Sequence, residues 1–170
     1  MKTIYARRSI RTFTDEPVNQ QDLLKIIKAG MNAPSAVNQQ PWEFVIIDSQ
    51  DIIDGVLEVH PNAKPAKSAP VSILVCGTPS REKSQGYWPI DCAAAVENML
   101  LEITDLGLGA CWLGIYPREP RVKKLQEMLR APKDVIPFAL IAVGHPAEEK
   151  PPKDLYDEQR IHKNSWGERL

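Results

Sequence analysis

Residues 91–106 carry apolar side chains on nearly every face of a predicted helix, and this segment constrains the fold more than any other. Its apolar positions are Ala93, Ala94, Ala95, Val96, Met99, Leu100, Ile103 and Leu106. Such a helix has to be covered on several sides. Because a chain of 170 residues offers few places to bury it, we expect a second copy of the chain to cover part of its surface.

Helical and extended apolar periods alternate along the rest of the chain. Helices are expected over residues 19–31, 50–59 and 120–129, and strands over residues 44–47, 71–77, 110–116 and 136–144. Asn19 is placed as the N-cap of the first helix. Three prolines in residues 61–70 predict a loop without regular structure. The alternation predicts one α/β/α sandwich of three layers over residues 1–170, and it leaves the strand direction open.

The charge of the chain is nearly balanced, with a formal net charge of −1 and an isoelectric point of about 6.3. A surface for nucleic acid or a membrane needs an extended basic field, so neither partner is expected. No segment has the length of a signal peptide core or the roughly 18 apolar residues of a membrane span. We therefore expect a cytoplasmic protein.

Residues 7–13, RRSIRTF, gather Arg7, Arg8, Ser9 and Arg11 near the start of the chain. Guanidinium groups and a hydroxyl form a donor set suited to bidentate binding of a phosphate. The alternative is a solvated surface carrying unremarkable arginines, and composition alone favours that alternative.

Residues 33–42, APSAVNQQPW, combine a helix stop with amide side chains that can read the donor and acceptor edge of a ring. The alternative is a plain loop between a helix and a strand. Further along, Gly107 and Gly109 follow a helix and precede a strand, the reverse of a dinucleotide fingerprint. Gly114 lies inside the expected strand, where a missing side chain lets a flat ligand approach the backbone.

No hydrolase or metal motif is present in the sequence. There is no G-x-S-x-G and no H-E-x-x-H, and the three histidines are scattered. Cys76, Cys92 and Cys111 stand in apolar runs, which indicates buried thiols rather than a disulfide framework or a metal site. Hydrogen-bond donors without an evident nucleophile indicate that a cofactor performs the bond-making chemistry.

The segment after Pro146 is polar and contains prolines, so residues 147–170 are expected to form an arm. This arm keeps Leu155, Tyr156 and Trp166, which a disordered tail usually lacks. We expect it to pack on a partner subunit, because one small domain supplies little apolar cover for these side chains.

In order and spacing, the chain resembles the FMN-dependent nitroreductases. The resemblance rests on RRSIRTFTDEPV, APSAVNQQPWEFVII, SAPVSILVCG, AAAVENMLLEITDLGLGACWLGIY and RIHKNSWG. It implies an α+β fold with a mostly antiparallel sheet between helices, in contrast to the parallel sheet that alternation alone favours. It also implies a homodimer with two FMN sites at the subunit interface.

The resemblance assigns roles to the first group of candidate residues. Arg7 and Ser9 match positions that hold the FMN phosphate and ribityl chain, and Arg8 lies beside them in the sequence. Arg11 matches the basic position near flavin N1, where a fixed cation stabilises the negative charge of the reduced ring.

The remaining assignments extend along the chain. Pro34, Ser35, Asn38 and Gln40 match a segment that reaches the flavin ring of the opposite subunit. Trp112, Leu113 and Gly114 match a strand end along one face of the ring, and Arg160 matches a C-terminal basic residue that returns to the phosphate.

The activity that the resemblance implies is transfer of electrons from NAD(P)H through FMN to a nitroaromatic, quinone or similar acceptor, in ping-pong order. Alternatives are a non-catalytic FMN-binding or sensor protein and another reductive flavoenzyme of the same superfamily, such as a dehalogenase. The short segment between Ser80 and Pro89 leaves the choice of acceptor open.

Overall fold

The computed structural model describes residues 2–169, and its centre is a sheet of four antiparallel strands in the order β1-β2-β4-β3. The strands are β1 (Trp42–Ile47), β2 (Val71–Gly77), β3 (Gly109–Gly114) and β4 (Ile136–Gly144). All four strands expected from the sequence are confirmed. The third ends two residues earlier than expected, because the amides of Ile115 and Tyr116 both donate to the carbonyl oxygen of Phe138.

The strand directions follow from the position of β4 between β2 and β3. Both neighbours run antiparallel to β4, so β2 and β3 run in the same direction without touching. The helix α5 (Trp88–Asp105) connects them and crosses β4 on the way. The antiparallel sheet implied by the resemblance is thus confirmed, and it fixes the strand direction that the alternation of helices and strands left open.

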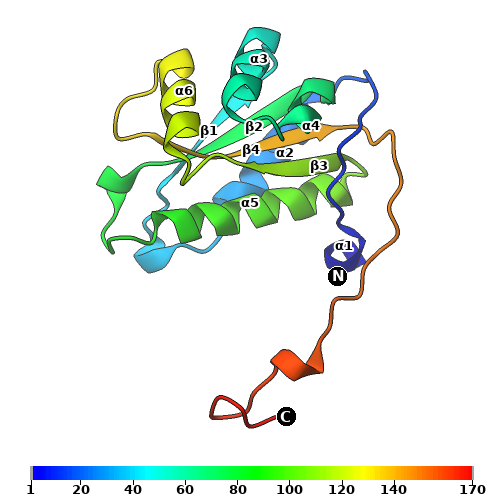
Figure 1. The fold of residues 1–170 in the computed structure, drawn as a ribbon, viewed down its shortest axis with the longest axis vertical. Helices are drawn as coiled ribbons and strands as arrows, with labels where there is room; N and C mark the ends of the chain where they lie inside the picture. The colour runs from blue at the N-terminus through cyan, green and yellow to red at the C-terminus, as the bar shows by residue number, and fades with distance from the viewer. Residues whose placement is uncertain (1, 170) are drawn as a thin grey trace.

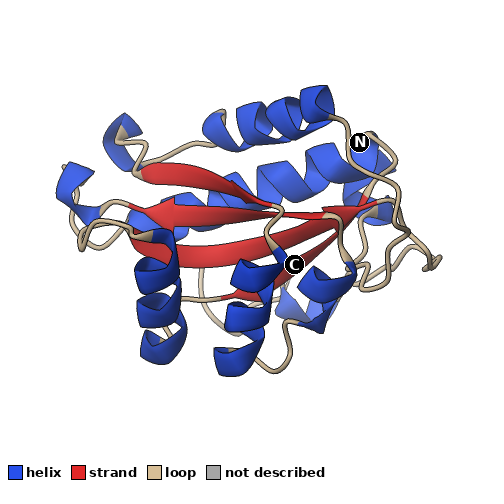
Figure 2. Ribbon diagram, turned by 90° about the horizontal axis from the view of Figure 1, so that it is seen from above, coloured by secondary structure: helices blue, strands red, loops and turns tan. Residues whose placement is uncertain are grey.

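Helices cover both faces of the sheet, which confirms the three-layer α/β/α sandwich (Figures 1 and 2). On one face α5 packs with α2 (Gln20–Met31), and on the other α3 (Gln50–Val59) packs with α6 (Glu119–Leu129). Successive residues of β2 alternate between the two cores: Ile73 lies in the α2–α5 core and Leu74 in the α3–α6 core.

The contact between α2 and α5 includes a glycine. A Cβ atom at Gly30 would lie 2.9 Å from the side chain of Met99, so a larger residue there would displace the Met99 side chain. Asn19 caps α2 as expected, because its side chain accepts a hydrogen bond of 2.8 Å from the amide of Gln21. Sequence and packing therefore place α2 firmly against α5.

The long apolar helix begins at Trp88, three residues before the expected start, because Glu82 accepts a 2.7 Å hydrogen bond from the amide of Trp88. Its inner side is fully buried at Met99 and Ile103, whereas Ile90 remains exposed. No helix among residues 2–169 combines the length and the apolar character needed to cross a membrane.

One expectation about local structure is wrong. Residues 64–68 of the expected loop form the short helix α4 (Lys64–Ser68). Pro65 occupies its first turn, where a missing N–H costs no hydrogen bond, so prolines do not prevent a helix at this position. The sequence also did not predict the short helix α1 (Lys2–Ala6) or the 3-10 turns η1 (Ala36–Asn38), η2 (Pro79–Arg81) and η3 (Glu158–Arg160).

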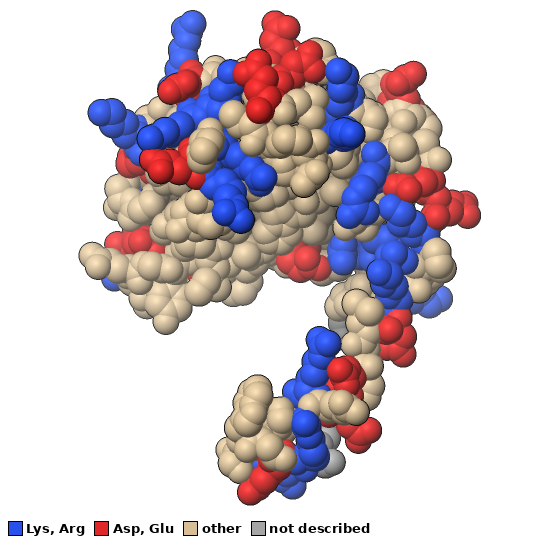
Figure 3. Space-filling model, viewed as in Figure 1, with Lys and Arg blue, Asp and Glu red and all other residues tan. Residues whose placement is uncertain are grey.

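The arm, residues 147–169 in the described chain, leaves β4 beside Thr12 and Phe13, passes α1 and extends away from the body (Figures 1 and 3). Leu155 is 79% exposed and Trp166 is 91% exposed. Trp166 stacks on His162 of the same arm with ring centroids 4.4 Å apart. The arm therefore carries large apolar surfaces that the body of its own chain does not cover.

Candidate functional site

The N-terminal segment lies along the edge of the sheet. Ser9 forms a parallel bridge with Ala110, and the amide of Ile10 donates a 2.9 Å hydrogen bond to the carbonyl oxygen of Ala110. Gly109 permits this approach, since a Cβ atom there would lie 2.9 Å from the Cβ of Ile10. The expected phosphate-binding residues are thus held beside β3.

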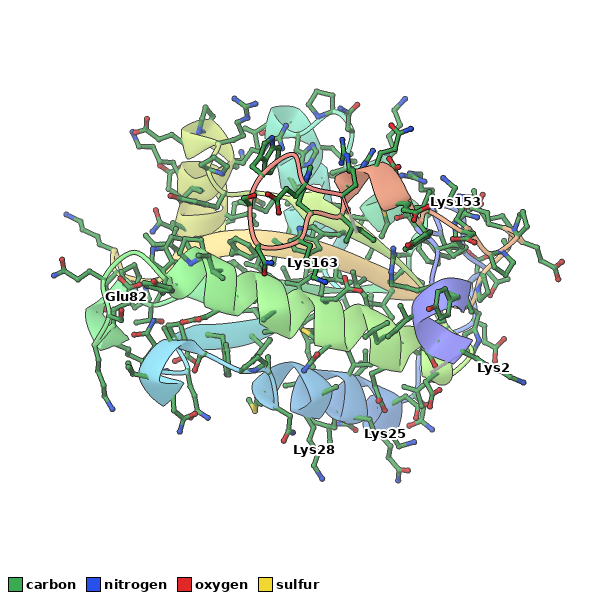
Figure 4. The ribbon with its side chains drawn as sticks, turned by 90° about the horizontal axis from the view of Figure 1, so that it is seen from below. Lys2, Lys25, Lys28, Glu82, Lys153 and Lys163 are labelled. Atoms are coloured by element: carbon green, nitrogen blue, oxygen red, sulfur yellow. The ribbon has the colours of Figure 1, made fainter. Side chains whose placement is uncertain are left out.

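Beside this bridge is a pocket of about 300 Å³ that gathers basic side chains (Figures 3 and 4). Its lining residues are Ile4, Tyr5, Arg7, Arg8, Ser9, Arg11, Lys150, Lys153 and Leu155. The structure therefore brings together all four residues expected from RRSIRTF. Lys150 and Lys153 complete the group, and the sequence analysis missed them because they stand about 140 positions away.

Internal contacts hold the cations of this basic pocket in place without neutralising all of them. The Arg7 guanidinium lies 3.6 Å from the carboxylate of Glu97 on α5, and Arg8 donates to the carbonyl oxygen of Pro151. The Arg11 guanidinium donates a hydrogen bond of 3.3 Å to the carbonyl oxygen of Ser9, which leaves further donors of its fork available to a ligand.

Glu148 ties the start of the arm to the basic pocket. Its carboxylate accepts a hydrogen bond from the backbone amide of Arg11 and lies 2.9 Å from Nζ of Lys150. The amide of Arg11, followed by the ammonium of Lys150, lowers the pKa of Glu148 to about 2. Glu148 is therefore ionised at neutral pH and balances one positive charge at the pocket rim.

Residues 34–40 form a strained turn between α2 and β1. Val37, Asn38 and Gln40 adopt φ angles of 45°, 54° and 47°. Left-handed backbone at a non-glycine residue costs on the order of 1–3 kcal/mol and persists where the surroundings fix it. Here the hydroxyl oxygen of Ser35 accepts a 3.0 Å hydrogen bond from the amide of Gln40. Asn38 and Gln40 are exposed, as expected of residues that reach a ligand.

The buried carboxylate of Asp91 holds the same turn on its inner side. Asp91, in the first turn of α5, accepts hydrogen bonds from the amide of Ala36 at 2.9 Å and from Nε2 of Gln39 at 2.7 Å. Both Asp91 and Gln39 are buried. The sequence analysis missed them; an acid at the start of an otherwise apolar helix was the one available signal.

The strand end at residues 112–114 presents mainly backbone. Trp112 is 37% exposed, whereas the side chain of Leu113 is buried in the α3–α6 core, so Leu113 can meet a ligand only through its backbone. A Cβ atom at Gly114 would meet no other atom within 4 Å. The open space that the sequence predicts at Gly114 is therefore present.

Within one chain these groups occupy different places. The turn at residues 34–40 contacts the start of α5 through Asp91, whereas Thr3 of α1 donates to Asp105 at the other end of the helix. Figure 4 shows the separation: Glu82 marks the start of α5, and Lys153 lies beside α1. Arg160 is on the exposed arm, paired with Asp157 at 2.9 Å, and does not line the basic pocket.

Fold and pocket together define an α+β protein that presents a concentrated positive charge at the edge of its sheet. The sequence model described as the nitroreductase family matches residues 4–68 and 58–145. The chain belongs to the nitroreductase family.

Individual relatives resemble the chain over nearly its whole length. A protein of Methanothermobacter thermautotrophicus, provisionally named NADH dehydrogenase/NAD(P)H nitroreductase, is 42% identical over 98% of this chain and 87% of its own. A crystal structure from Parabacteroides distasonis with the same provisional name has a TM-score of 0.92 and 38% identity, covering 97% of both chains. A provisionally named nitroreductase of Desulfovibrio desulfuricans, solved with FMN, has a TM-score of 0.78 and 32% identity over 91% of both chains.

Proposed function

We propose that this protein is an FMN-dependent oxidoreductase that uses NAD(P)H to reduce a nitroaromatic, quinone or similar acceptor. The basic pocket at the start of the edge strand β3, whose other end is open at Gly114, is the observation that carries this proposal. The names of the relatives support it, since one refers to NAD(P)H nitroreductase and another was solved with FMN.

The donor set of the basic pocket fits the phosphate of FMN. Arg7, Arg8 and Arg11 offer guanidinium forks, Ser9 adds a hydroxyl, and Lys150 and Lys153 add ammonium groups within the same lining. A dianionic phosphate needs several cationic donors in one place, and this pocket supplies them. Arg160 would add a further cation if the arm of a partner subunit brought it there.

The ring of the cofactor would lie toward the strand end. Gly114 leaves room for a flat ring against the backbone, and Trp112 offers an exposed aromatic face next to it. Bound FMN would supply the two-electron chemistry that no side chain of this site provides. Arg11 would hold a fixed positive charge near the reduced ring and so favour reduction.

A homodimer would complete the site. The turn with Pro34, Ser35, Asn38 and Gln40 lies at the opposite end of α5 from the basic pocket, so it does not join the expected phosphate-binding residues of its own chain. A second copy related by two-fold symmetry could supply the missing turn to each pocket. The exposed Leu155, Tyr156 and Trp166 support a partner that covers the arm.

The two substrates would take the same place above the ring in turn, which gives a ping-pong order. The test is the visible spectrum of the purified protein, after FMN is added if necessary, before and after anaerobic NADH or NADPH. We expect flavin absorbance that bleaches and returns when a quinone is added. Protein that stays colourless with added FMN would contradict the proposal, and bound flavin that neither nucleotide bleaches would favour a non-catalytic binder.

A further inference from the structure

The side chain of Gln39 lies buried at a junction of three segments. Its Nε2 donates a hydrogen bond of 2.7 Å to the carboxylate of Asp91 on α5. Its Oε1 accepts hydrogen bonds from the amides of Lys83 at 3.0 Å and Ser84 at 3.1 Å. Both ends of one amide are thus satisfied, by a helix start on one side and by a connecting segment on the other. A buried amide with all these partners has one orientation, because turning it over would break three hydrogen bonds.

The turn that contains Gln39 depends on this junction. Left-handed residues flank Gln39 on both sides, at Asn38 and Gln40, and the amide of Ala36 also ends on Asp91. Strained backbone keeps its shape only where neighbouring contacts fix it. Gln39 and Asp91 provide such contacts, and they do so through groups buried beneath the exposed side of the turn.

The segment of residues 82–88 is the third member of the junction. The carboxylate of Glu82 accepts from the amides of Gly86 and Trp88 at 3.2 and 2.7 Å, which closes the segment into a turn at the start of α5 (Figure 4). Among the described residues, the only side-chain hydrogen bonds between this turn and residues 34–40 are those of Gln39, which accepts from the amides of residues 83 and 84. A shift of either segment is therefore passed to the other.

Exposed aromatic rings border this segment. Tyr87 is 47% exposed, and Trp88 packs edge-on against Tyr116 with ring centroids 4.8 Å apart. Tyr116 is itself exposed and follows the strand end at Gly114 by two residues. Aromatic faces of this kind stack on planar aromatic molecules.

We propose that Gln39 is a positioning residue that fixes residues 82–88 against the turn at residues 34–40 and thereby sets the size of planar aromatic acceptor that the site admits. The inference rests on the proposed function, since it takes residues 34–40 to border the bound flavin. Gln39 itself need not touch the flavin or the acceptor, because it acts through the amides of Lys83 and Ser84.

The test uses FMN-loaded wild-type protein and the Gln39→Ala variant. Hydrogen exchange at the amides of Lys83 and Ser84 should become at least about 10-fold faster in the variant, because both lose their acceptor. Steady-state kinetics with a small acceptor, 1,4-benzoquinone, and a two-ring acceptor, menadione, should show a changed ratio of the two KM values. We expect that ratio to shift by about 5-fold or more, with kcat for each acceptor within about 2-fold.

A reciprocal exchange of groups provides a rescue. Gln39→Glu alone places two carboxylates face to face and should act like Gln39→Ala. Combined with Asp91→Asn, it restores a donor opposite an acceptor, while the new carboxylate still accepts from the amides of Lys83 and Ser84. The double variant should therefore recover the wild-type KM ratio and slow exchange, which a general loss of stability would not do.

Gln126→Ala is the matched control. The side-chain amide of Gln126 also links two segments, because it donates a hydrogen bond of 2.9 Å from α6 to the carbonyl oxygen of Val135. It should leave the KM ratio unchanged. If Gln39→Ala does not fold, Gln39→Asn serves the same test, since it is one methylene too short for the junction. An FMN-loaded variant with a wild-type KM ratio, or a control with the same shift, would overturn this inference alone; wild-type protein that never binds FMN would overturn the proposed function first.

Discussion

Nη1 of Arg121 donates a 2.7 Å hydrogen bond to the carbonyl oxygen of Gly114. Arg121 belongs to the first turns of α6, and Gly114 is the last residue of β3. Arg121 lies on the face of the sheet that α3 and α6 cover. Its hydrogen bond fixes the backbone at Gly114, which has no side chain of its own to anchor the strand end. In the proposed site the backbone of this strand end lies along the flavin. The contact from α6 therefore fixes a stretch of backbone that the cofactor would also touch.

Replacing Arg121 by alanine should weaken FMN binding about 10-fold, since a hydrogen bond from a charged donor contributes about 1.5–3 kcal/mol. Fluorescence titration of the apoprotein with FMN measures the effect. Lys123→Ala is the control, because Lys123 lies on the same helix but pairs with Glu119 at the surface. Equal affinity of the Arg121 variant and the wild type would show that the strand end does not need this bond.

Neutralising Arg7 and Arg11 together, as Arg7→Gln and Arg11→Gln, should weaken FMN binding by at least about 100-fold, because two charge-assisted contacts to a phosphate are lost. The same titration measures it, with the thermal stability of the apoprotein as a check on folding. Lys25→Gln with Lys28→Gln removes the same charge from α2, away from the basic pocket (Figure 4). A double arginine variant that stays yellow through purification would disprove the placement of the phosphate.

His60 predicts a dependence of stability on pH. It is buried, neither ring nitrogen has a hydrogen-bond partner among the described residues, and burial, followed by the charge of Arg121, lowers its pKa. The unfolded chain therefore binds a proton at higher pH than the folded protein does. The free energy of unfolding should be highest above about pH 7 and should fall as the pH drops through the ordinary histidine value near 6.5.

Urea unfolding between pH 8 and pH 5 tests this expectation. His60→Leu should flatten the fall and leave the protein at least as stable at pH 7, because it also removes two unpaired buried nitrogens. His145→Gln, which keeps His60, should retain the fall that His60 causes. A His60→Leu variant with the same pH dependence as the wild type would exclude this histidine as the cause.

Deleting residues 155–170 should weaken self-association and flavin retention together, because Leu155, Tyr156 and Trp166 expose apolar surface that a partner would cover. Sedimentation velocity and the ratio of flavin to protein after gel filtration measure the two effects. Trp166→Ser is a milder variant that should act in the same direction. A truncated protein that remains a dimer with full flavin would refute the role of the arm.

Local patterns predicted the elements well where they depend on nearby residues. Asn19 before an apolar helical period was enough to predict α2, and the run at residues 71–77 was enough to predict β2. The strand order was not predictable in this way, because β4 lies between β2 and β3 through contacts that no local period encodes. The antiparallel arrangement came from the resemblance to a family, which carries information about the whole chain. The helix at Lys64–Ser68 was not predicted, because three prolines in residues 61–70 suggested a loop although Pro65 stands in the first turn, where proline is tolerated.

The candidate site shows the same division. Arg7 and Arg11 could be chosen as candidate site residues because positive charge clusters there. Gly114 could be chosen because a glycine stands within an expected strand. Lys150 enters the same pocket from the far end of the chain, so no spacing rule connects it with them. Gln39 stands in a run of polar residues, and only the buried Asp91 opposite it distinguishes its role from that of its neighbours.

The basic pocket is built from residues 4–11 and 150–155, and the hydrogen bond from Lys150 to the carbonyl oxygen of Ser9 joins positions 141 residues apart. During synthesis on the ribosome, the opening arginines emerge long before the lysines that complete the lining. If the pocket holds the FMN phosphate as proposed, a chain whose sheet has formed still lacks two of its cations until residues 150–153 pack against residues 7–11, and cofactor loading would then be one of the last steps of folding.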